Sequence, residues 1–372
     1  MRALLTQIAK TGIACEAATA SIFDPPRQVV LDDVVSRHRL SISTKSEALE
    51  SISFVGVADG DITHTILKTA SSRRNALSAG EESALLSLIE RKIGEFKPEI
   101  ILTYGGLNVE RNIHRLAKAS NIPVVFYLAN GLYRKAETFA SVDMILVPSR
   151  FLADFYADRL GLRANVLRDT FIKDNYLAIR ENPRYITYVN PVPQKGLTLF
   201  SRIASEALRR LPGAEFLVVE GRWTKEDVAR AGLKLDRIPN IKVIPNRTDM
   251  REVYARTKIL LFPSLWNEAS GRMPVEAQLN GIPVLASRVG GIAENLNGGG
   301  FLFDIPERCA ANHMAVPTPE EVGPWIERIG ALLEDDNAYE EAERRALLAA
   351  EAFDPERIAG TALDLFKELP KR

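Results

Sequence analysis

The strongest chemical signal in the sequence is a pair of glutamates, Glu268 and Glu276, with seven residues between them. Glu268 follows an apolar run over 259–262 that predicts a buried strand, and Glu276 lies early in a helical pattern over 273–280. In open α/β sheets, ligands bind where a strand ends beside a helix N-terminus. The free N–H groups and the positive end of the helix dipole suit a phosphate there.

The residues between the two glutamates fit an anion. Gly271 permits close approach of the backbone, and Arg272 adds a guanidinium suited to phosphate oxygens. A carboxylate accepts hydrogen bonds from sugar hydroxyls but is a poor partner for a phosphate. The pattern therefore describes a diphosphate with a hydroxyl-bearing ring on each side, which is a nucleotide-sugar. A plainer interpretation stays open, in which Glu276 caps its helix at N3 and Glu268 is a solvated loop residue.

Lys195 places a second cation at a strand end. Residues 185–190 read as a strand, and the loop VNPVPQKG carries Lys195 to the next helix. Its ammonium could reach a phosphate, and the alternative is a surface lysine in a turn. Gly221 and Arg222 follow the next strand at the same sheet edge, where Arg222 either approaches the phosphates or forms a structural ion pair.

These residues need a sheet to position them. Short apolar runs alternate with amphipathic stretches, which predicts parallel strands covered by helices on both faces. The predicted strands are ACEAATASIFD, EIILTYG, PVVFYLAN, MILVPS, RYITYVN, EFLVVEG, IKVIPN, ILLFPS, PVLAS and GFLFDI. The predicted helices cover 81–97, 109–119, 150–160, 197–210, 249–256, 273–280 and 319–333, and Pro274 is expected at the N1 position of its helix. We expect an α/β fold with two doubly wound, Rossmann-like domains.

A polar stretch, KDNYLAIRENP, predicts the boundary between the domains. The predicted domains are 1–178 and 183–355, and 356–372 is expected to be a helix that packs back on the first domain. A helical pattern opens the chain, and the first convincing strand lies at 15–24. Either the usual opening strand is absent or the start is truncated.

Composition excludes several classes of protein. Lys+Arg is 48 and Asp+Glu is 48, so overall charge gives no footprint for nucleic acid. A hydrophobic content of 46% excludes a disordered chain. Cys15 and Cys309 make neither a metal motif nor a disulfide framework, and a cytoplasmic location is expected. No apolar run is long enough for a transmembrane helix, and we read no signal peptide.

A set of motifs in order carries a family resemblance. They are the VNPVPQKG loop, the strand ending in EGR, PSLWNEASGRMPVEA, GIPVLAS and VGGIAENLNGGG. Residues 185–305 resemble the donor-binding half of a GT-B glycosyltransferase and are most similar to the retaining family 4 group. Residues 98–160 resemble the acceptor-side domain less specifically. The resemblance implies a GT-B fold, with two Rossmann-like domains facing a cleft.

The resemblance also implies roles for the charged residues. Glu268 would contact the hydroxyls of the donor sugar near the reacting carbon, and Lys195 would neutralise the diphosphate leaving group. Glu276 would hold the ribose hydroxyls of the nucleotide. Glu268 and Lys195 are thus the expected catalytic residues.

The remaining donor-binding residues are expected in the same turn and in the neighbouring loops. Gly271, Arg272 and Met273 would offer backbone N–H groups, with Ser270 beside them. Asn190 stands where the family often has an arginine, five residues before its lysine.

Two departures from the family pattern follow from these positions. With Asn190 in place of the arginine, the missing charge would come from Arg272 or from Arg222, which directly follows Gly221. After the strand at 123–129 the family often has a histidine, and this sequence has Ala129 or Asn130 in its place.

The partners implied are a nucleoside-diphosphate-sugar donor and a saccharide or other hydroxyl acceptor, recognised within 1–180. The resemblance implies retention of configuration and no metal or other cofactor, and peripheral membrane contact is compatible with it. The alternatives are an inactive nucleotide-sugar-binding protein and a sugar-nucleotide epimerase on the same fold. A nicotinamide enzyme is disfavoured because no GxGxxG follows a first strand. Asp59-Gly60-Asp61 is expected to be an exposed turn rather than a metal motif, and His38, His64, His114 and His313 make no ligand pair.

Overall fold

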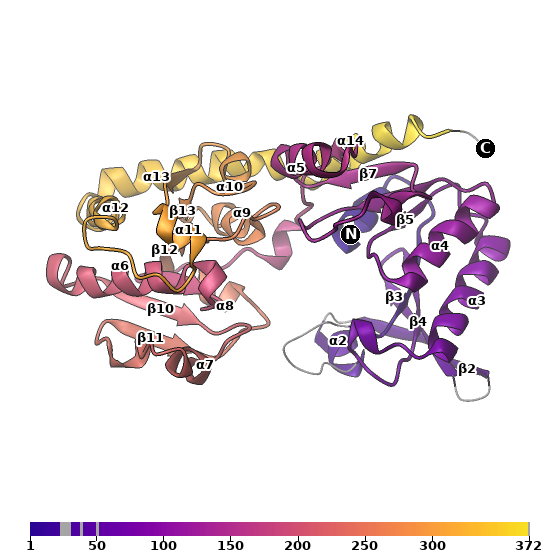
Figure 1. The fold of residues 1–372 in the computed structure, drawn as a ribbon, viewed down its shortest axis with the longest axis horizontal. Coiled ribbons are helices and arrows are strands. Elements are labelled where there is room, and N and C mark those ends of the chain that lie inside the picture. Colours follow the sequence, from indigo (N-terminus) through magenta and orange to yellow (C-terminus); the bar gives the residue numbers. More distant parts are fainter. Residues whose placement is uncertain (23–30, 38–39, 50–51, 371–372) are drawn as a thin grey trace. The chain divides into compact units, whose positions relative to one another are not determined.

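A computed structural model describes residues 1–22, 31–37, 40–49 and 52–370 (Figure 1). The described chain forms two compact units. Unit 1 contains Met1–Val147, Ala153–Thr170 and Pro355–Arg372, and unit 2 contains Pro148–Leu152 and Phe171–Asp354. The chain therefore passes from one unit to the other four times. Two of these crossings lie within or just before helix α5 (Arg150–Leu160).

Unit 2 is built on one six-stranded sheet with the order β11-β10-β9-β12-β13-β14. All neighbouring strands in it are parallel. The strands are β9 (Tyr185–Val189), β10 (Glu215–Val219), β11 (Ile241–Ile244), β12 (Thr257–Phe262), β13 (Val284–Ser287) and β14 (Gly300–Phe303). Strands β10, β9 and β12 are adjacent, so the loops that follow them meet at the same carboxyl edge. These are the strands whose ends carry the predicted site residues.

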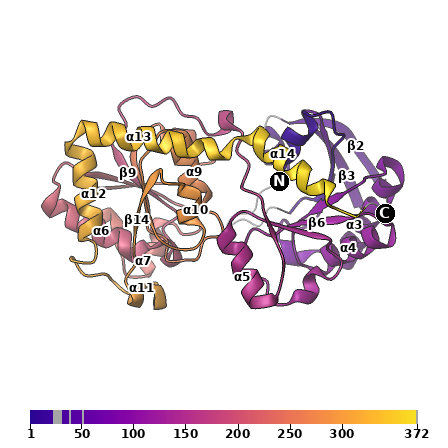
Figure 2. The same ribbon diagram turned by 90° about the horizontal axis from the view of Figure 1, so that it is seen from above.

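Helices cover both faces of this sheet, as a parallel sheet requires. They are α6 (Leu197–Arg210), α7 (Lys225–Arg230), α8 (Arg251–Tyr254), α9 (Arg272–Leu279), α10 (Ile292–Leu296), α11 (Glu307–Ala311), α12 (Gly323–Glu334) and α13 (Asp336–Ala350). Helix α13 packs along α9 and α12, and α12 also contacts α6 (Figure 2).

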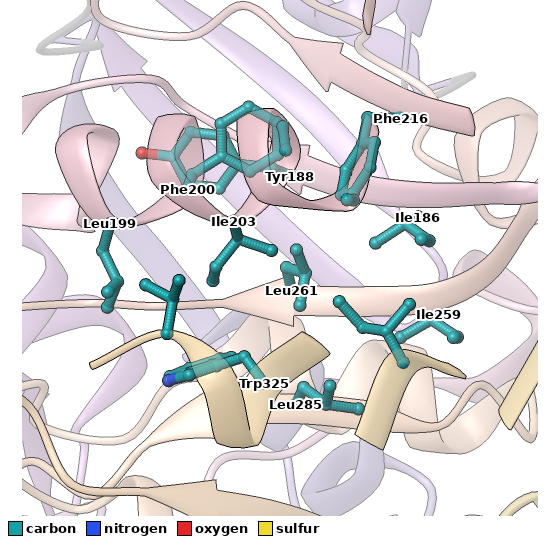
Figure 3. Packing of buried hydrophobic residues seen from close by; sticks show 14 of the residues in the cluster. Ile186, Tyr188, Leu199, Phe200, Ile203, Phe216, Ile259, Leu261, Leu285 and Trp325 are labelled. Carbon is teal, nitrogen blue, oxygen red and sulfur yellow. The ribbon is translucent and has the colours of Figure 1, made fainter. Parts of the chain in front are cut away.

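The main core of unit 2 lies between the sheet and helices α6 and α12. Figure 3 shows the rings of Tyr188 and Phe200 stacked, with Phe216 and Trp325 in the same cluster. The centroids of Tyr188 and Phe200 are 4.4 Å apart, and both side chains are fully buried. Burial of this cluster against one face of β9 and β12 helps to fix the strands whose ends carry the site.

Unit 1 has two four-stranded sheets instead of one. The first has the order β1-β4-β3-β2 and pairs β1 with β4 in parallel, whereas β4-β3-β2 is antiparallel. The second, β5-β6-β7-β8, is parallel. The strands are β1 (Glu16–Ala20), β2 (Ser41–Leu49), β3 (Ile52–Asp59), β4 (Ile62–Leu67), β5 (Ile101–Thr103), β6 (Val124–Tyr127), β7 (Met144–Val147) and β8 (Asn165–Val166).

The helices of unit 1 link the two sheets. They are α1 (Arg2–Ala9), α2 (Leu31–Arg37), α3 (Ala79–Phe96), α4 (Asn108–Ala119) and α14 (Pro355–Lys367), together with most of α5. Helix α3 packs on β1 and β4, and α4 packs on β6 and on α3. The C-terminal helix α14 lies against α1, as Figure 2 shows.

Two local predictions are corrected by the structure. Helix α9 begins at Arg272, so Pro274 is its third residue rather than its first, and Glu276 is its fifth. The interpretation of Glu276 as an N3 cap is therefore wrong. The strands within 41–67 were not predicted, and Asp59-Gly60-Asp61 is the tight turn between β3 and β4. Asp59 is not a solvated turn residue, because Arg2 pairs with it at 2.5 Å.

Candidate functional site

Lys195 and Glu268, which are far apart in sequence, form an ion pair at the carboxyl edge of the unit 2 sheet. Lys195 lies near the end of the β9–α6 loop (residues 190–196), and Glu268 lies in the β12–α9 loop (residues 263–271). The Ser264 hydroxyl donates to Glu268 Oε1 at 2.7 Å, and the Lys195 ammonium lies 5.4 Å from the centre of the Phe262 ring. The Glu268 side chain is 13% exposed and that of Lys195 is 24% exposed. A cation and an anion are thus held together at a partly open position.

The two loops pack directly on each other, which explains the glycine after Lys195. Gly196 has φ +80°, and a Cβ at this position would overlap the carbonyl oxygen of Pro263. The backbone N–H of Leu265 donates to the carbonyl of Gln194 at 2.9 Å. Only glycine combines this backbone conformation with this approach, so the position of Lys195 is determined by main-chain packing.

Asn190 begins the β9–α6 loop and joins it to the loop after β10. Its φ is +63°, a left-handed conformation that asparagine tolerates better than most residues. Its side-chain oxygen accepts a hydrogen bond from the backbone N–H of Arg222 at 2.8 Å. A Cβ on Gly221 would lie 2.6 Å from the same oxygen, so only glycine leaves room for it. The structure therefore brings Asn190, Gly221 and Arg222 together, with Asn190 fixing the turn.

Glu276 is held by a buried tyrosine. The Tyr254 hydroxyl, from α8, donates to Glu276 Oε2 at 2.7 Å, and the Glu276 side chain is 14% exposed. Burial, and then the neighbouring carboxylate, raises the pKa of Tyr254 well above its ordinary value. The phenol therefore stays protonated and orients the carboxylate. Sequence reasoning missed Tyr254, because it lies 22 positions before Glu276 and no local pattern links the two residues.

Arg272, the first residue of α9, turns its side chain toward Glu276. Its Nε lies 3.9 Å from Glu276 Oε1, and its terminal nitrogen donates to the Tyr176 hydroxyl at 3.1 Å. The guanidinium carbon is 4.4 Å from the centre of the Phe171 ring. The guanidinium is thus beside the carboxylate at Glu276, while the backbone of Arg272 forms the start of the helix.

The turn that leads into α9 is fixed from outside. Gly271 has φ +79° and is the N-cap of the helix, and Met273 is its second residue. Ser270 is buried, and the Asn295 amide donates to both its carbonyl and its hydroxyl at 2.7 Å. The predicted residues on both sides of this turn, Glu268 and Glu276, are therefore set on a rigid frame at the N-terminus of α9.

Part of the chain that contains these loops matches a known protein family. Residues 183–335 match the family described as Glycosyl transferases group 1. These residues belong to that family. They contain the β9–α6 loop, the β12–α9 loop and α9, so we call residues 183–335 the group 1 domain.

Two curated relatives cover different parts of the chain. The lipopolysaccharide 1,2-N-acetylglucosaminetransferase of Salmonella typhimurium is 25% identical over 294 residues, which is 73% of each chain. The D-inositol 3-phosphate glycosyltransferase of Nocardia farcinica is 27% identical over 170 residues, covering 43% of this chain and 35% of the relative.

Solved structures show the fold of the whole chain. The sucrose-phosphate synthase of Thermosynechococcus elongatus has a TM-score of 0.65 at 12% identity, covering 95% of this chain and 98% of its own. An Anabaena protein solved with UDP-glucose has a TM-score of 0.57 at 18% identity, with 77% of this chain and 82% of its own covered. The fold is GT-B, as the sequence predicted. The family match and the two curated relatives identify the chain as a glycosyltransferase.

The other candidate groups contribute little to a site. Among residues 1–22, 31–37, 40–49 and 52–370, no cluster of three or more His, Cys, Asp or Glu side chains could hold a metal ion. His64 lies 3.5 Å from Asp59, and burial lowers its pKa. Burial lowers the pKa of His114 to about 4, and its ring packs edge-on against Phe126. His38 lies outside the described residues.

Two findings concern the rest of the chain. In the part of the chain that the structure describes, no helix is long and apolar enough to cross a membrane. Cys15 and Cys309 are both free thiols, and Cys309 is buried.

Proposed function

We propose that this protein transfers a sugar from a nucleoside-diphosphate-sugar to a hydroxyl group of an acceptor, with retention of configuration and without a metal ion. The observation that carries the proposal is the Lys195–Glu268 pair beside the N-terminus of α9. Glu276 lies within α9 and is held there by Tyr254 from α8. These groups provide, in one place, a cation, a helix N-terminus and two partly exposed carboxylates.

Each part of the donor has a matching group. The diphosphate would lie at the N-terminus of α9, beside the ammonium of Lys195. The donor sugar would offer hydroxyls to Glu268, and the ribose would offer hydroxyls to Glu276. A diphosphate at Lys195 would compete with Glu268 for the ammonium, which frees one oxygen of Glu268 to accept from the sugar.

The proposed chemistry depends on stabilising a leaving group. As the bond between the anomeric carbon and the β-phosphate oxygen breaks, negative charge grows on the diphosphate. Lys195 and the N–H groups at the start of α9 are already in place for that charge, so no reorganisation is needed during the reaction. The acceptor hydroxyl would attack on the face that the diphosphate leaves and pass its proton to the departing phosphate oxygen, which retains configuration.

For the acceptor, we propose a cavity of about 360 Å³ in unit 1. It opens where β5 and β6 end, and its lining includes Tyr104, Tyr127, Tyr133 and Asn130. The Tyr127 hydroxyl donates to the buried Asp169 at 2.7 Å. Aromatic faces and an amide suit the apolar faces and hydroxyls of a saccharide.

The free thiols of Cys15 and Cys309 support a reducing compartment, and we propose the cytoplasm.

Nucleotide binding tests the proposal directly. Thermal unfolding is measured with UDP, GDP, ADP, TDP and CMP, because a ligand at about 100 times its Kd adds about 2.7 kcal/mol to the stability of the state that binds it. We expect one nucleoside diphosphate to stabilise the protein, and Glu276→Gln to remove most of this effect. The matched control is Glu252→Gln in α8, whose carboxylate is 62% exposed. If no nucleotide stabilises the wild type, the proposal is wrong.

Turnover separates this function from the two alternatives. A transferase consumes the donor sugar quickly only when an acceptor is present, whereas an epimerase needs no acceptor and an inactive binding protein consumes nothing. The measurements are release of the nucleoside diphosphate and the identity of the sugar in the remaining donor, with and without a panel of saccharides. The anomeric configuration of the product, read by NMR, decides between retention and inversion.

A further inference from the structure

Three consecutive carbonyl groups in the β12–α9 loop are each fixed by a donor from elsewhere in unit 2. The carbonyl of Glu268 accepts from the backbone N–H of Gly291 at 2.8 Å. The carbonyl of Ala269 accepts from the hydroxyl of Ser149, and that of Ser270 accepts from the amide of Asn295 at 2.7 Å. A loop seldom has every carbonyl in a row held by a separate partner, because loops mostly leave these groups to water.

Ser149 and Asn295 are buried, so these contacts are protected from water. Both side chains are 0% exposed. Ser149 also lies close to Gly291, where an added Cβ would come within 2.9 Å of the Ser149 side chain and 2.6 Å of the Ala269 carbonyl oxygen. The absence of a side chain at Gly291 therefore lets Ser149 reach the loop.

The start of α5, directly after Ser149, is anchored by Glu294, a neighbour of Asn295 in α10. The Glu294 carboxylate accepts from the backbone N–H of Arg150 at 2.7 Å and from that of Phe151 at 3.4 Å. A carboxylate at the first turn of a helix is stabilised by the helix dipole. The Ser149 hydroxyl in addition accepts from the N–H of Leu152 at 3.2 Å. The N-terminus of α5 is thus hydrogen-bonded both to α10 and to the β12–α9 loop.

The consequence for the loop follows from peptide geometry. In a trans peptide the C=O of one residue and the N–H of the next point in opposite directions. Fixing the carbonyls of Glu268, Ala269 and Ser270 therefore aims the N–H groups of Ala269, Ser270 and Gly271 away from α10 and Ser149. These N–H groups immediately precede the N-terminus of α9, so they extend its array of donors.

We propose that Ser149 and Asn295 are positioning residues, which orient the backbone N–H groups of the β12–α9 loop for the β-phosphate of the donor. The proposal rests on the function proposed above and adds two residues that act through the backbone without touching the ligand. Because α5 continues into unit 1 after Leu152, the phosphate-binding loop is also tied to the segment that joins the units along the chain.

The test compares Ser149→Ala and Asn295→Ala with Ser205→Ala. Ser205 is a matched control, because its hydroxyl donates to a backbone carbonyl at 2.8 Å within α6. Calorimetry measures the Kd of the stabilising nucleoside diphosphate and of its monophosphate. We expect each test variant to weaken the diphosphate about tenfold, the size of one well-made hydrogen bond to a charged group, and the monophosphate by less than about twofold. A merely structural role would weaken both nucleotides equally, and that result would overturn the proposal.

A second measurement does not need a ligand. Hydrogen exchange of the peptide that covers residues 264–275 should become faster in Ser149→Ala and Asn295→Ala, and should be unchanged in Ser205→Ala. Unchanged exchange in both test variants also overturns the proposal. If the wild type binds no nucleotide, the proposed function fails, and the exchange data still decide whether these two side chains hold the loop.

Discussion

The two units build the ends of their parallel strands by different means. In unit 2 the loops after β9 and β12 contact each other through their main chains, and charged side chains stand on that frame. In unit 1 the corresponding region near the end of β6 is held by aromatic rings. Phe126 makes edge-on contacts with Tyr133, Phe139 and His114, with ring centroids 5.1–5.8 Å apart.

On the function proposed above, the difference separates two tasks of a transferase. A diphosphate is a fixed chemical group, and a rigid set of charges and backbone donors serves it in every donor. An acceptor varies, and a cavity lined by tyrosines can accept different saccharides through faces and hydroxyls. The sheets differ accordingly, since unit 2 has six continuous parallel strands whereas unit 1 divides its strands between two sheets.

The role of fixed charge in unit 2 is tested most strongly by a substitution of Lys195. We expect Lys195→Met to lower kcat/KM by about 10²–10³-fold, because it removes the preorganised positive charge that would stabilise the leaving group. Lys225→Met is the matched control, since Lys225 is 59% exposed on α7. Initial rates of donor consumption measure the effect. A loss below about fivefold would mean that Lys195 does not face the growing charge.

The main-chain packing of the two loops in unit 2 is tested by a substitution of Gly196. Gly196→Ala places a Cβ against the carbonyl of Pro263 and forces a left-handed backbone on alanine, so we expect unit 2 to lose about 3 kcal/mol of stability. Gly213→Ala is the control, because nothing lies within 4 Å of its added Cβ. Urea unfolding followed separately in the two units measures the change, and unit 1 should keep its midpoint. An unchanged unit 2 midpoint contradicts the close packing of the two loops.

Sequence alone predicted more of unit 2 than of unit 1 for a physical reason. The strands of a sheet covered on both faces are apolar throughout, and runs such as RYITYVN and ILLFPS stand out. Within residues 41–67 the strands are antiparallel and partly polar, as in SISTKSEAL, and no apolar run marks them. The predicted helix over 273–280 begins one residue late, and Pro274 is the third residue of α9 rather than its first, because proline suits the first turn as a whole.

The candidate site shows the same division. Residues on the strand ends, such as Lys195 and Glu268, could be found because parallel strands bring their carboxyl ends to one edge. Their partners could not. Tyr254, Asn295 and Ser149 contact the site from other elements, and only tertiary packing determines which buried polar group meets which loop.

The aromatic cluster of unit 1 is tested by the pH dependence of the stability of that unit. His114 is buried, and in the described part of the chain neither ring nitrogen has a hydrogen-bond partner. Its pKa is about 4 in the folded protein, against 6.5 for an ordinary histidine. As pH falls below about 6.5, the unfolded chain binds a proton at this position and the folded chain does not, so stability falls.

We expect this proton to cost unit 1 about 2 kcal/mol between pH 7 and pH 5. His114→Phe keeps a ring against Phe126 and should remove that part of the pH dependence. Urea unfolding of the wild type and the variant at both pH values gives the difference. Equal pH dependence in the two proteins would show that His114 is not buried in its neutral form, and unit 2 should respond equally in both.

The smallest expected effect tests how a buried group tunes the charged site. Tyr254→Phe removes the hydroxyl that donates to Glu276, so we expect nucleotide affinity to fall about fivefold, or about 1 kcal/mol. The same unit offers a matched control, because Tyr188 is equally buried and its hydroxyl has no partner among the described residues. Tyr188→Phe should leave the Kd unchanged when both variants are titrated by calorimetry. Equal losses in the two variants would mean that the site responds to core packing in general, and that the carboxylate of Glu276 is not oriented by Tyr254.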